Sequence, residues 1–114
     1  MKVYGFKDGE EGIMELGCDL ESEQSYVGGL IDVVRVTPEL DLVVNDEGLL
    51  LGMEPSVAWV EDGKVLGVYV GNCFVCRHRD GEFISIEEKD IETIKQLLKP
   101  IYGIIGNSIL LKRN

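Results

Sequence analysis

The sequence predicts an α+β fold, in which a twisted and mainly antiparallel sheet of about five or six strands forms a single domain with two helices. Two patterns support this class. Short runs rich in β-branched residues are separated by turn dipeptides such as Asp8-Gly9 and Asp62-Gly63. One segment, at about 86–99, has the apolar spacing of a helix that packs on one face of a sheet. A chain of 114 residues also has the length for one hydrophobic core.

The central part of the chain is predicted to form a hairpin. Gly28 and Gly29 supply the positive φ with which a preceding helix ends. Residues 30–36 are dense in β-branched side chains, and residues 40–44 alternate so that every second one shares a face. Pro38 fixes φ in the connection, where no ladder N–H is needed. Two antiparallel strands joined by a turn are the expected result.

Two strands and a short helix are expected before this hairpin. Residues 3–7 form the first strand, and residues 13–16 can pair back onto it. A short helix follows near 20–27. Either Asp19 or Ser22 caps it, because both side chains can accept a hydrogen bond from the first helical turn.

After the hairpin, the Asn-Asp-Glu-Gly sequence at 45–48 predicts a turn. Residues 49–53 are apolar throughout and are expected to be buried. A strand-like run at 57–60 contains the single tryptophan. Trp59 is interpreted first as a packing residue and second as a platform for a bound ligand.

Residues 65–70 and 73–77 are two further strand-like runs. Gly71 and Asn72 lie between them and suit a two-residue hairpin turn, but one long strand kinked at the glycine is an equal alternative. Residues 82–86 form the last run before the predicted helix.

The helix at about 86–99 is the best coded in the chain. Ser85 and Glu88 fit a capping box, and acidic residues crowd its start while lysines occupy its end. Its apolar stripe consists of Ile91, Ile94 and Leu98. Pro100 is expected to end it.

Residues 100–114 are predicted to extend a domain that spans residues 1–99. This apolar extension is either a hairpin about Gly106-Asn107 packed on the same domain, or a tail that packs on a partner. In the second case it could join copies of the chain into a homo-oligomer.

Charge is the strongest compositional signal, with 21 acidic and 11 basic side chains and a formal net charge of −10. Residues 1–62 hold 15 acids and three bases, whereas residues 63–114 hold six acids and eight bases. Counterion release cannot favour a duplex that meets a negative surface, so direct binding of nucleic acid is not expected. The acid excess either keeps a small protein soluble or imitates the phosphates of DNA.

The sequence also predicts a cytoplasmic protein. No apolar run approaches the length of a membrane span, and the N-terminus lacks the apolar core of a signal peptide. Three cysteines do not suggest a disulfide framework. No membrane contact is expected.

The metal-binding candidates are Cys73, Cys76 and His78, because two thiolates and an imidazole can hold zinc. A structural site needs a fourth ligand, and an extended C-x-x-C sequence directs its two side chains to opposite faces of a sheet. Ordinary buried thiols are therefore favoured over zinc binding. The sequence shows neither a nucleophile elbow nor a phosphate loop, so no catalytic residue, enzymatic activity or cofactor is predicted.

The chain resembles a known family in several blocks that occur in order: residues 27–34, 41–48 with 51–55, and 71–75 with 81–86. These are similar to the motif blocks of the domain-of-unknown-function family three-eight-four-six. The family pattern more often has Tyr-Ile-Glu where this chain has Leu30-Ile31-Asp32. The resemblance implies a gene carried by bacterial phages, plasmids or conjugative elements, and it implies no mechanism.

If the family shares a ligand site, its polar positions in this chain are Asp32, Asn45, Asp46, Glu47 and Asn72. The alternative is structural, because residues 45–48 form a turn in either case. A pocket is expected near Asn45 or Trp59 if the ligand is small.

The leading hypothesis is a small non-enzymatic binding or regulatory protein of a mobile element, whose partner is an unknown protein or small molecule. The alternatives are an acidic DNA mimic that inhibits a host DNA-binding or defence protein, and a zinc-binding protein.

Overall fold

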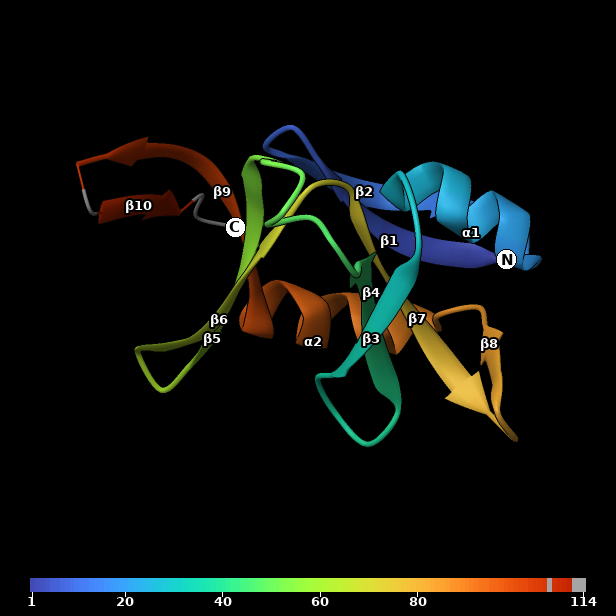
Figure 1. Ribbon diagram of the computed structural model, residues 1–114. Coiled ribbons are helices and arrows are strands. Elements are labelled where there is room, and N and C mark those ends of the chain that lie inside the picture. Colours follow the sequence, from blue (N-terminus) through green and yellow to red (C-terminus); the bar gives the residue numbers. More distant parts are fainter. Residues whose placement is uncertain (107, 112–114) are drawn as a thin grey trace.

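The computed structural model describes residues 1–106 and 108–111, and within them it has ten strands and two helices (Figure 1). In chain order these are β1 (Lys2–Lys7), β2 (Glu10–Glu15), α1 (Leu20–Val27), β3 (Ile31–Arg35), β4 (Leu40–Asn45), β5 (Pro55–Glu61), β6 (Lys64–Val70), β7 (Cys73–Arg79), β8 (Glu82–Ile84), α2 (Glu88–Leu97), β9 (Leu98–Ile105) and β10 (Ser108–Leu111). The predicted α+β class is confirmed. The larger of the two sheets has six strands, as predicted, and the second sheet of four strands was not predicted.

The larger sheet contains six antiparallel strands in the order β2-β1-β7-β4-β3, with β8 pairing to β7. Both predicted hairpins are confirmed. Val3 lies opposite Met14 in the first, and Val33 lies opposite Val43 in the second. The strand β7 comes from a later part of the chain and lies between the two hairpins, so it joins them into one sheet.

The smaller sheet has the order β10-β9-β5-β6. The chain passes from this sheet to the larger one at Gly71, whose φ of 75° bends the backbone between β6 and β7. The hairpin alternative for residues 71–72 is wrong, because β6 pairs with β5 alone and β7 pairs with β1, β4 and β8. The strand-like run is instead kinked at the glycine and divided between two sheets.

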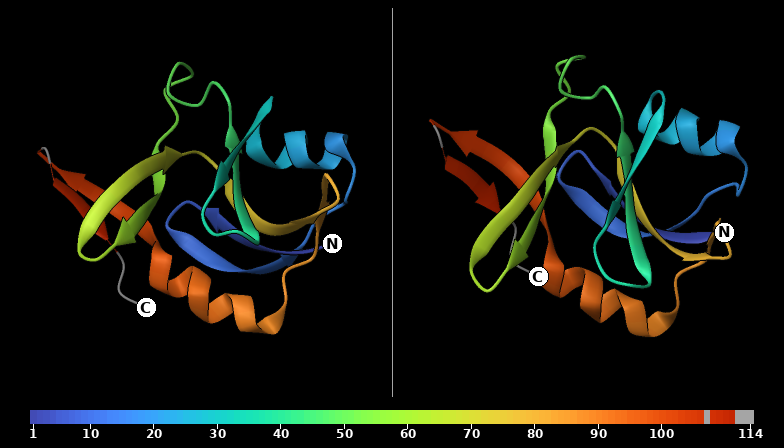
Figure 2. Two further views of the ribbon diagram at one scale, coloured as in Figure 1. Left: turned by 90° about the horizontal axis from the view of Figure 1, so that it is seen from below. Right: turned by 60° about the horizontal axis from the view of Figure 1, so that its bottom comes forward.

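The larger sheet is buried on both faces, as the fully buried strand β4 shows. Leu42 and Val75 point into a core shared with the smaller sheet and with Ile94 of α2. Val43 and Phe74 point to the opposite side, where Val27 of α1 covers them. Figure 2 shows α1 and α2 on opposite sides of this sheet. Such two-sided burial explains why β4 and β7 read as continuous apolar runs rather than as alternating ones.

The short helix α1 starts and ends as predicted. Asp19 is its N-cap, and Asp19 Oδ1 accepts a hydrogen bond of 2.8 Å from the Ser22 N–H. The Ser22 hydroxyl donates to the other carboxylate oxygen, which decides between the two capping candidates. Gly28 ends the helix in the left-handed conformation with φ of 88°.

The second predicted helix is confirmed, but it is about two residues shorter at each end and has another N-cap. Glu87, not Ser85, is the N-cap, and the Glu87 N–H donates to Asp90 Oδ2 at 2.7 Å. Ser85 Oγ instead accepts a hydrogen bond from the Lys2 N–H. The helix stops at Leu97, and Leu98 is already extended at the start of β9. Pro100 lies within β9 and disfavours the helical conformation only at Lys99, the residue before it.

The expectation that residues 49–53 are buried is also wrong. Leu49 and Leu50 are 81% and 86% exposed, and Leu51 is 60% exposed. Hydrogen bonds from the Leu51 N–H to Glu47 O and from the Met53 N–H to Gly48 O close this loop locally. The loop therefore satisfies its own backbone and leaves the leucine side chains outside.

The two strands β9 and β10 extend beyond the rest of the fold. Only residues 98–100 of β9 pair with β5, and from Ile101 onward the pairing partner is β10. Figure 1 shows the two-stranded segment projecting from one end of the molecule. We call residues 101–106 and 108–111 the arm. β9 runs across residue 99, where the sequence predicted the boundary between the domain and its extension. Asn107 and residues 112–114, which belong to the predicted extension, lie outside the described residues.

Neither helix in the described part of the chain is long and apolar enough to cross a membrane.

Candidate functional site

The residues predicted to bind a ligand do not form one group. Asn45 and Asn72 are directed inward and contact the end of α1. Asp46 and Glu47 are exposed on the turn after β4. The other two candidates, Asp32 and Trp59, belong to separate strands in different sheets.

Both asparagines satisfy the C-terminal carbonyl groups of α1. Asn45 Nδ2 donates to Val27 O at 3.1 Å, and Asn72 Nδ2 donates to Tyr26 O at 3.0 Å. The last carbonyls of a helix have no partner within it, so these side chains replace the missing bonds. Asn45 Oδ1 also accepts from the Glu47 N–H at 2.7 Å, which fixes the turn. Three separated motif blocks are thus joined at one point by structural hydrogen bonds.

We expect Asn45→Ala to lower the free energy of unfolding by about 2 kcal/mol, because it removes two hydrogen bonds and leaves the buried Val27 carbonyl without a donor. Urea unfolding followed by circular dichroism measures this. Asp46→Ala is the control, since the Asp46 side chain is exposed on the same turn, and it should change stability by less than about 0.5 kcal/mol. Equal stability of the Asn45 variant and the wild type would contradict the structural role.

The junction of these blocks also needs two glycines. A Cβ atom at Gly71 would lie 2.6 Å from Met53 Sδ, and one at Gly48 would lie 2.6 Å from a methyl group of Val70. The close approach of the loop after β4 to the bend between the two sheets therefore explains glycine at both positions.

Asp32 and Trp59 have local partners. Asp32 is exposed on β3, and its Oδ1 accepts a hydrogen bond from the Val33 N–H. Trp59 is half-buried against the core between the sheets, and its indole N–H donates to Glu61 at 3.0 Å. These contacts describe a surface carboxylate and a packing residue, each with a local hydrogen bond.

A hollow of about 330 Å³ lies beside the Asn45 turn, where a pocket was expected. Asp46, Glu47, Leu49 and Leu50 line one side of it, and Val68 to Val70 of β6 line the other. Its lining is mainly apolar and its rim carries two carboxylates. The exposed leucines of the loop therefore stand next to the outermost strand of the smaller sheet.

The structure does not bring together the three metal-binding candidates. Cys73 packs in the core between the sheets, whereas Cys76 packs on the opposite face beneath α1. Burial raises the pKa of Cys73 to about 11, and the Ser56 hydroxyl offsets only part of this effect. In the described ranges, no three His, Cys, Asp or Glu side chains are grouped closely enough to hold a metal ion.

A buried carboxylate, Asp41, lies beside His78, whose Nδ1 has no hydrogen-bond partner in the described part of the chain. His78 Nδ1 lies 3.1 Å from Asp41 Oδ2, and the exposed Arg35 approaches the same carboxylate at 3.5 Å. His78 is half-buried. Burial, together with the carboxylates of Asp41 and Glu23, raises the pKa of Cys76. Since the thiolate is the reactive form of cysteine, this environment keeps the thiol protonated and inert.

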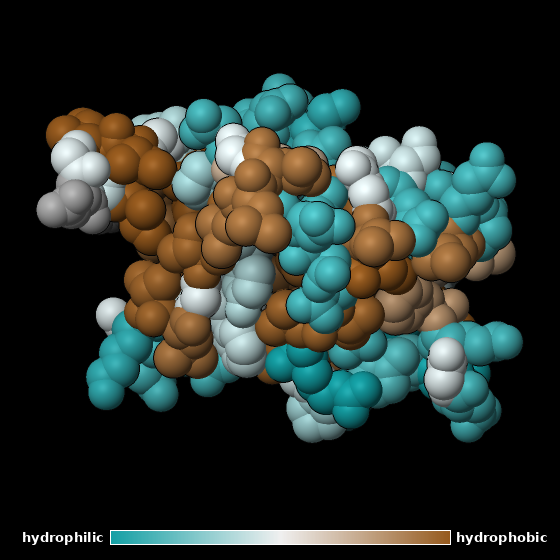
Figure 3. All heavy atoms as spheres, viewed as in Figure 1, coloured by the Kyte–Doolittle hydropathy of each residue, from teal (hydrophilic) through white to brown (hydrophobic). Residues whose placement is uncertain are grey.

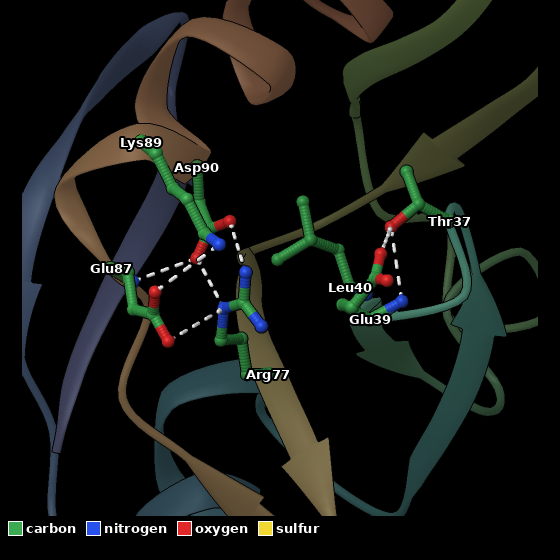
Figure 4. Close-up of polar contacts among 7 residues, drawn as sticks. All are labelled: Thr37, Glu39, Leu40, Arg77, Glu87, Lys89 and Asp90. Carbon is green, nitrogen blue, oxygen red and sulfur yellow. Dashed lines mark hydrogen bonds and ion pairs between the residues drawn. The ribbon is translucent and has the colours of Figure 1, made fainter.

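The strongest charge cluster connects β7 to α2 (Figure 4). Arg77 donates to both oxygens of Asp90, at 2.6 and 2.8 Å, and Glu87 lies 3.7 Å from the same guanidinium. Burial alone would raise the pKa of Asp90, but the hydrogen bonds from Arg77 and the Glu87 N–H and the charge of Arg77 lower it. The cluster holds the helix on the sheet.

The acidic side chains of residues 8–62 do not share one face. Asp8 lies in the turn after β1 and Glu39 in the turn after β3, and Figure 1 places these turns at opposite ends of the larger sheet. Glu23 and Asp41 are buried. A DNA mimic would need a continuous row of carboxylates, and these four side chains are not part of one such row.

The structure exposes two apolar surfaces, of which sequence reasoning missed the first and anticipated the second as an apolar extension. The first, which we call the leucine surface, consists of Leu49, Leu50, Leu51, Val65, Leu66 and Val68. The second is the arm, where Tyr102, Ile104 and Ile105 are at least half exposed. Figure 3 shows apolar side chains gathered over the arm, the β5–β6 hairpin and the loop after β4. For the leucine surface, the only signal in the sequence was the run of leucines, which is equally typical of a buried segment.

A second hollow, of about 520 Å³, lies at the base of the arm. Tyr102 and Ile104 of the arm form its apolar side, and Asp8 and Glu54 place carboxylates on its other side. The arm therefore offers an apolar surface next to two negative charges.

Comparison with known proteins gives one match. Residues 1–99 match the family described as "Domain of unknown function (DUF3846)". No curated protein and no solved structure matches the chain. The matched range ends where the arm begins.

Proposed function

Because the chain belongs to the DUF3846 family, whose description assigns no activity, we propose a function from the exposed surfaces of the protein itself. The chain is a small non-enzymatic regulatory protein that binds a partner protein with its arm. The proposal places it in the bacterial cytoplasm, in the phage, plasmid or conjugative setting that the family resemblance implies. The exposed, projecting arm is the observation that carries the proposal.

The arm has too few contacts of its own to be a stable element in isolation. Beyond Pro100 it consists of two strands paired only with each other, and two-stranded hairpins are marginally stable in water. Residues 100–111 carry no charged side chain, although the chain as a whole has a net charge of −10. Burying Tyr102, Ile104 and Ile105 against a partner would remove their apolar surface from water and stabilise the arm.

Charge indicates which kind of partner fits. Asp8 and Glu54 border the hollow at the base of the arm, and neither forms an ion pair within the described residues. The net charge of −10 attracts a basic protein and repels an acidic one. The proposed partner therefore has an apolar groove or strand edge flanked by lysine or arginine.

The non-enzymatic part of the proposal is supported by the state of the reactive groups. Both buried cysteines have raised pKa values. His78 is directed at Asp41, and the asparagines predicted as ligand residues are used by α1.

The test is affinity capture from the native host with wild-type protein, Ile105→Glu and Ile13→Glu, followed by measurement with the purified captured protein. Ile13 is exposed on β2 of the larger sheet and does not line the hollow at the base of the arm, so it is the control. Placing a carboxylate on the arm should weaken binding at least about tenfold, because a buried isoleucine contributes about 1.5–3 kcal/mol. The Ile13 variant should bind as the wild type does.

Added salt should weaken the complex, since its charges are of opposite sign. A partner that binds all three proteins equally, or one that is acidic, would overturn the proposal. Circular dichroism of each variant shows whether it is folded.

A further inference from the structure

The leucine surface lies at the open edge that β6 forms in the smaller sheet. Natural proteins protect edge strands with charges, prolines or bulges, because an open edge pairs with other chains. The edge strand β2 carries three glutamates, and β3 carries Asp32 and Arg35. The edge strand β6 has one charged residue, Lys64 at its start, followed by six residues without charge or proline, and its one irregularity is a register shift against β5 at Leu66.

We propose that a second copy of the chain covers this edge, with the two β6 strands paired antiparallel about a two-fold axis at Gly67. This arrangement places Val65 opposite Tyr69 of the second copy and Leu66 opposite Val68. Val65, Leu66 and Val68 are all at least 40% exposed in the single chain. Pairing would satisfy the backbone groups that β6 directs away from β5, and it would join two four-stranded sheets into one of eight strands.

The exposed leucines gain a contact in the same arrangement. Leu49 and Leu50 border the hollow next to Val68 to Val70, which is the end of β6 that meets the start of the other β6. Each loop therefore lies over Val65 and Leu66 of the second copy. The contact covers the most exposed apolar side chains of the protein, whose exposure to water is otherwise unfavourable.

Charges at the two ends of β6 are complementary in this orientation. Lys64 lies at the start of the strand, and Asp46 and Glu47 lie beside its end, around the hollow. None of the three forms an ion pair within residues 1–106 and 108–111. Antiparallel pairing brings each Lys64 to the acidic end of the other copy, whereas parallel pairing would keep like charges together.

Sedimentation equilibrium of the full chain tests the proposal, with Leu66→Glu and Ile13→Glu as a matched pair. The two side chains are 52% and 51% exposed and lie at the edges of different sheets. The wild type and the Ile13 variant should be dimers. In the Leu66 variant two carboxylates face the apolar surface of the other copy, so its dissociation constant should rise at least about 100-fold.

A wild-type protein that stays monomeric up to about 1 mM, where association contributes only about 4 kcal/mol, would overturn the proposal. So would a Leu66 variant that dimerises as the wild type does. If the protein is a monomer that binds a different polypeptide at Leu66, the proposal that a second copy covers this edge is equally overturned.

Charge reversal tests the orientation. Lys64→Glu and Glu47→Lys should each raise the dissociation constant, because each places like charges together. The double variant should restore most of the lost affinity if the two side chains meet across the interface. Additive losses in the double variant would exclude antiparallel pairing. Ile105→Glu should leave the dimer intact, so failure of this inference is distinguishable from failure of partner binding by the arm.

Discussion

Asp90→Ala is expected to lower the free energy of unfolding by about 3–5 kcal/mol, because removal of one partner leaves the other charge buried and unpaired. The side chains of Arg77 and Asp90 are only 13% and 6% exposed, and two short hydrogen bonds join them. Asp90 also accepts the Glu87 N–H at the start of α2. The variant therefore loses both the link between β7 and α2 and the cap of the helix.

The lowered pKa of Asp90 gives this effect a pH dependence of defined sign. The stabilisation is fully present above the pKa of the unfolded chain, about 3.8, and is lost as the pH falls through the lower pKa of the folded state. Wild-type stability should therefore fall in this acid range. The Asp90→Asn variant should not show the part of this loss of stability that comes from protonation of Asp90.

Urea unfolding at several pH values measures both effects. Glu87→Ala is the matched control, since Glu87 lies farther from Arg77 and its side chain is half exposed. This substitution should lower the free energy of unfolding by less than about 1 kcal/mol. Equal losses in the Glu87 and Asp90 variants would contradict the special role of the buried pair.

Phe74→Ala is expected to lower the free energy of unfolding by about 4 kcal/mol, because the buried ring is lost and a cavity is left in its place. Phe74 is fully buried near the start of β7 and packs edge-to-face on Tyr26 of α1, with ring centroids 6.0 Å apart. Its loss would also loosen α1, to which Asn45 and Asn72 are bonded.

Thermal and urea unfolding with Phe74→Leu as the control measure this effect. Leucine retains most of the apolar contact, so its cost should be about 1 kcal/mol. Hydrogen exchange of α1 should accelerate in the alanine variant. An alanine variant as stable as the leucine variant would show that the site relaxes and leaves no cavity.

Local signals in the sequence were sufficient for the hairpins and the first helix. The β-branched run at 31–35, the proline turn and the Asp19 cap each act through neighbouring residues. The second helix shows the limit of such signals. Ser85 is the better N-cap residue type, but in the fold its hydroxyl accepts a hydrogen bond from the Lys2 N–H, 83 residues away, and Glu87 is the N-cap.

The second sheet was not predictable from periodicity. A glycine and an asparagine between two apolar strands fit a hairpin as well as a crossing between sheets, and only the pairing partners of β6 and β7 distinguish them. The leucines at 49–51 lack any period, so their exposure depends on how the loop closes its backbone. The residue type of Asn45 and Asn72 indicated that they form hydrogen bonds. The groups that accept these bonds are carbonyl oxygens at the end of α1 rather than a ligand.

The position of β7 in the larger sheet has a consequence for synthesis of the chain on the ribosome. β1 and β2 can pair as soon as they emerge, but Tyr4 finds its partner on the other side only in Val75, 71 residues later. At about 5–20 residues per second, the open edge of β1 waits for several seconds. During this interval the chain made so far consists largely of the segment with 15 acids and three bases. Mutual repulsion of nascent chains on neighbouring ribosomes would then protect an edge that the finished fold covers.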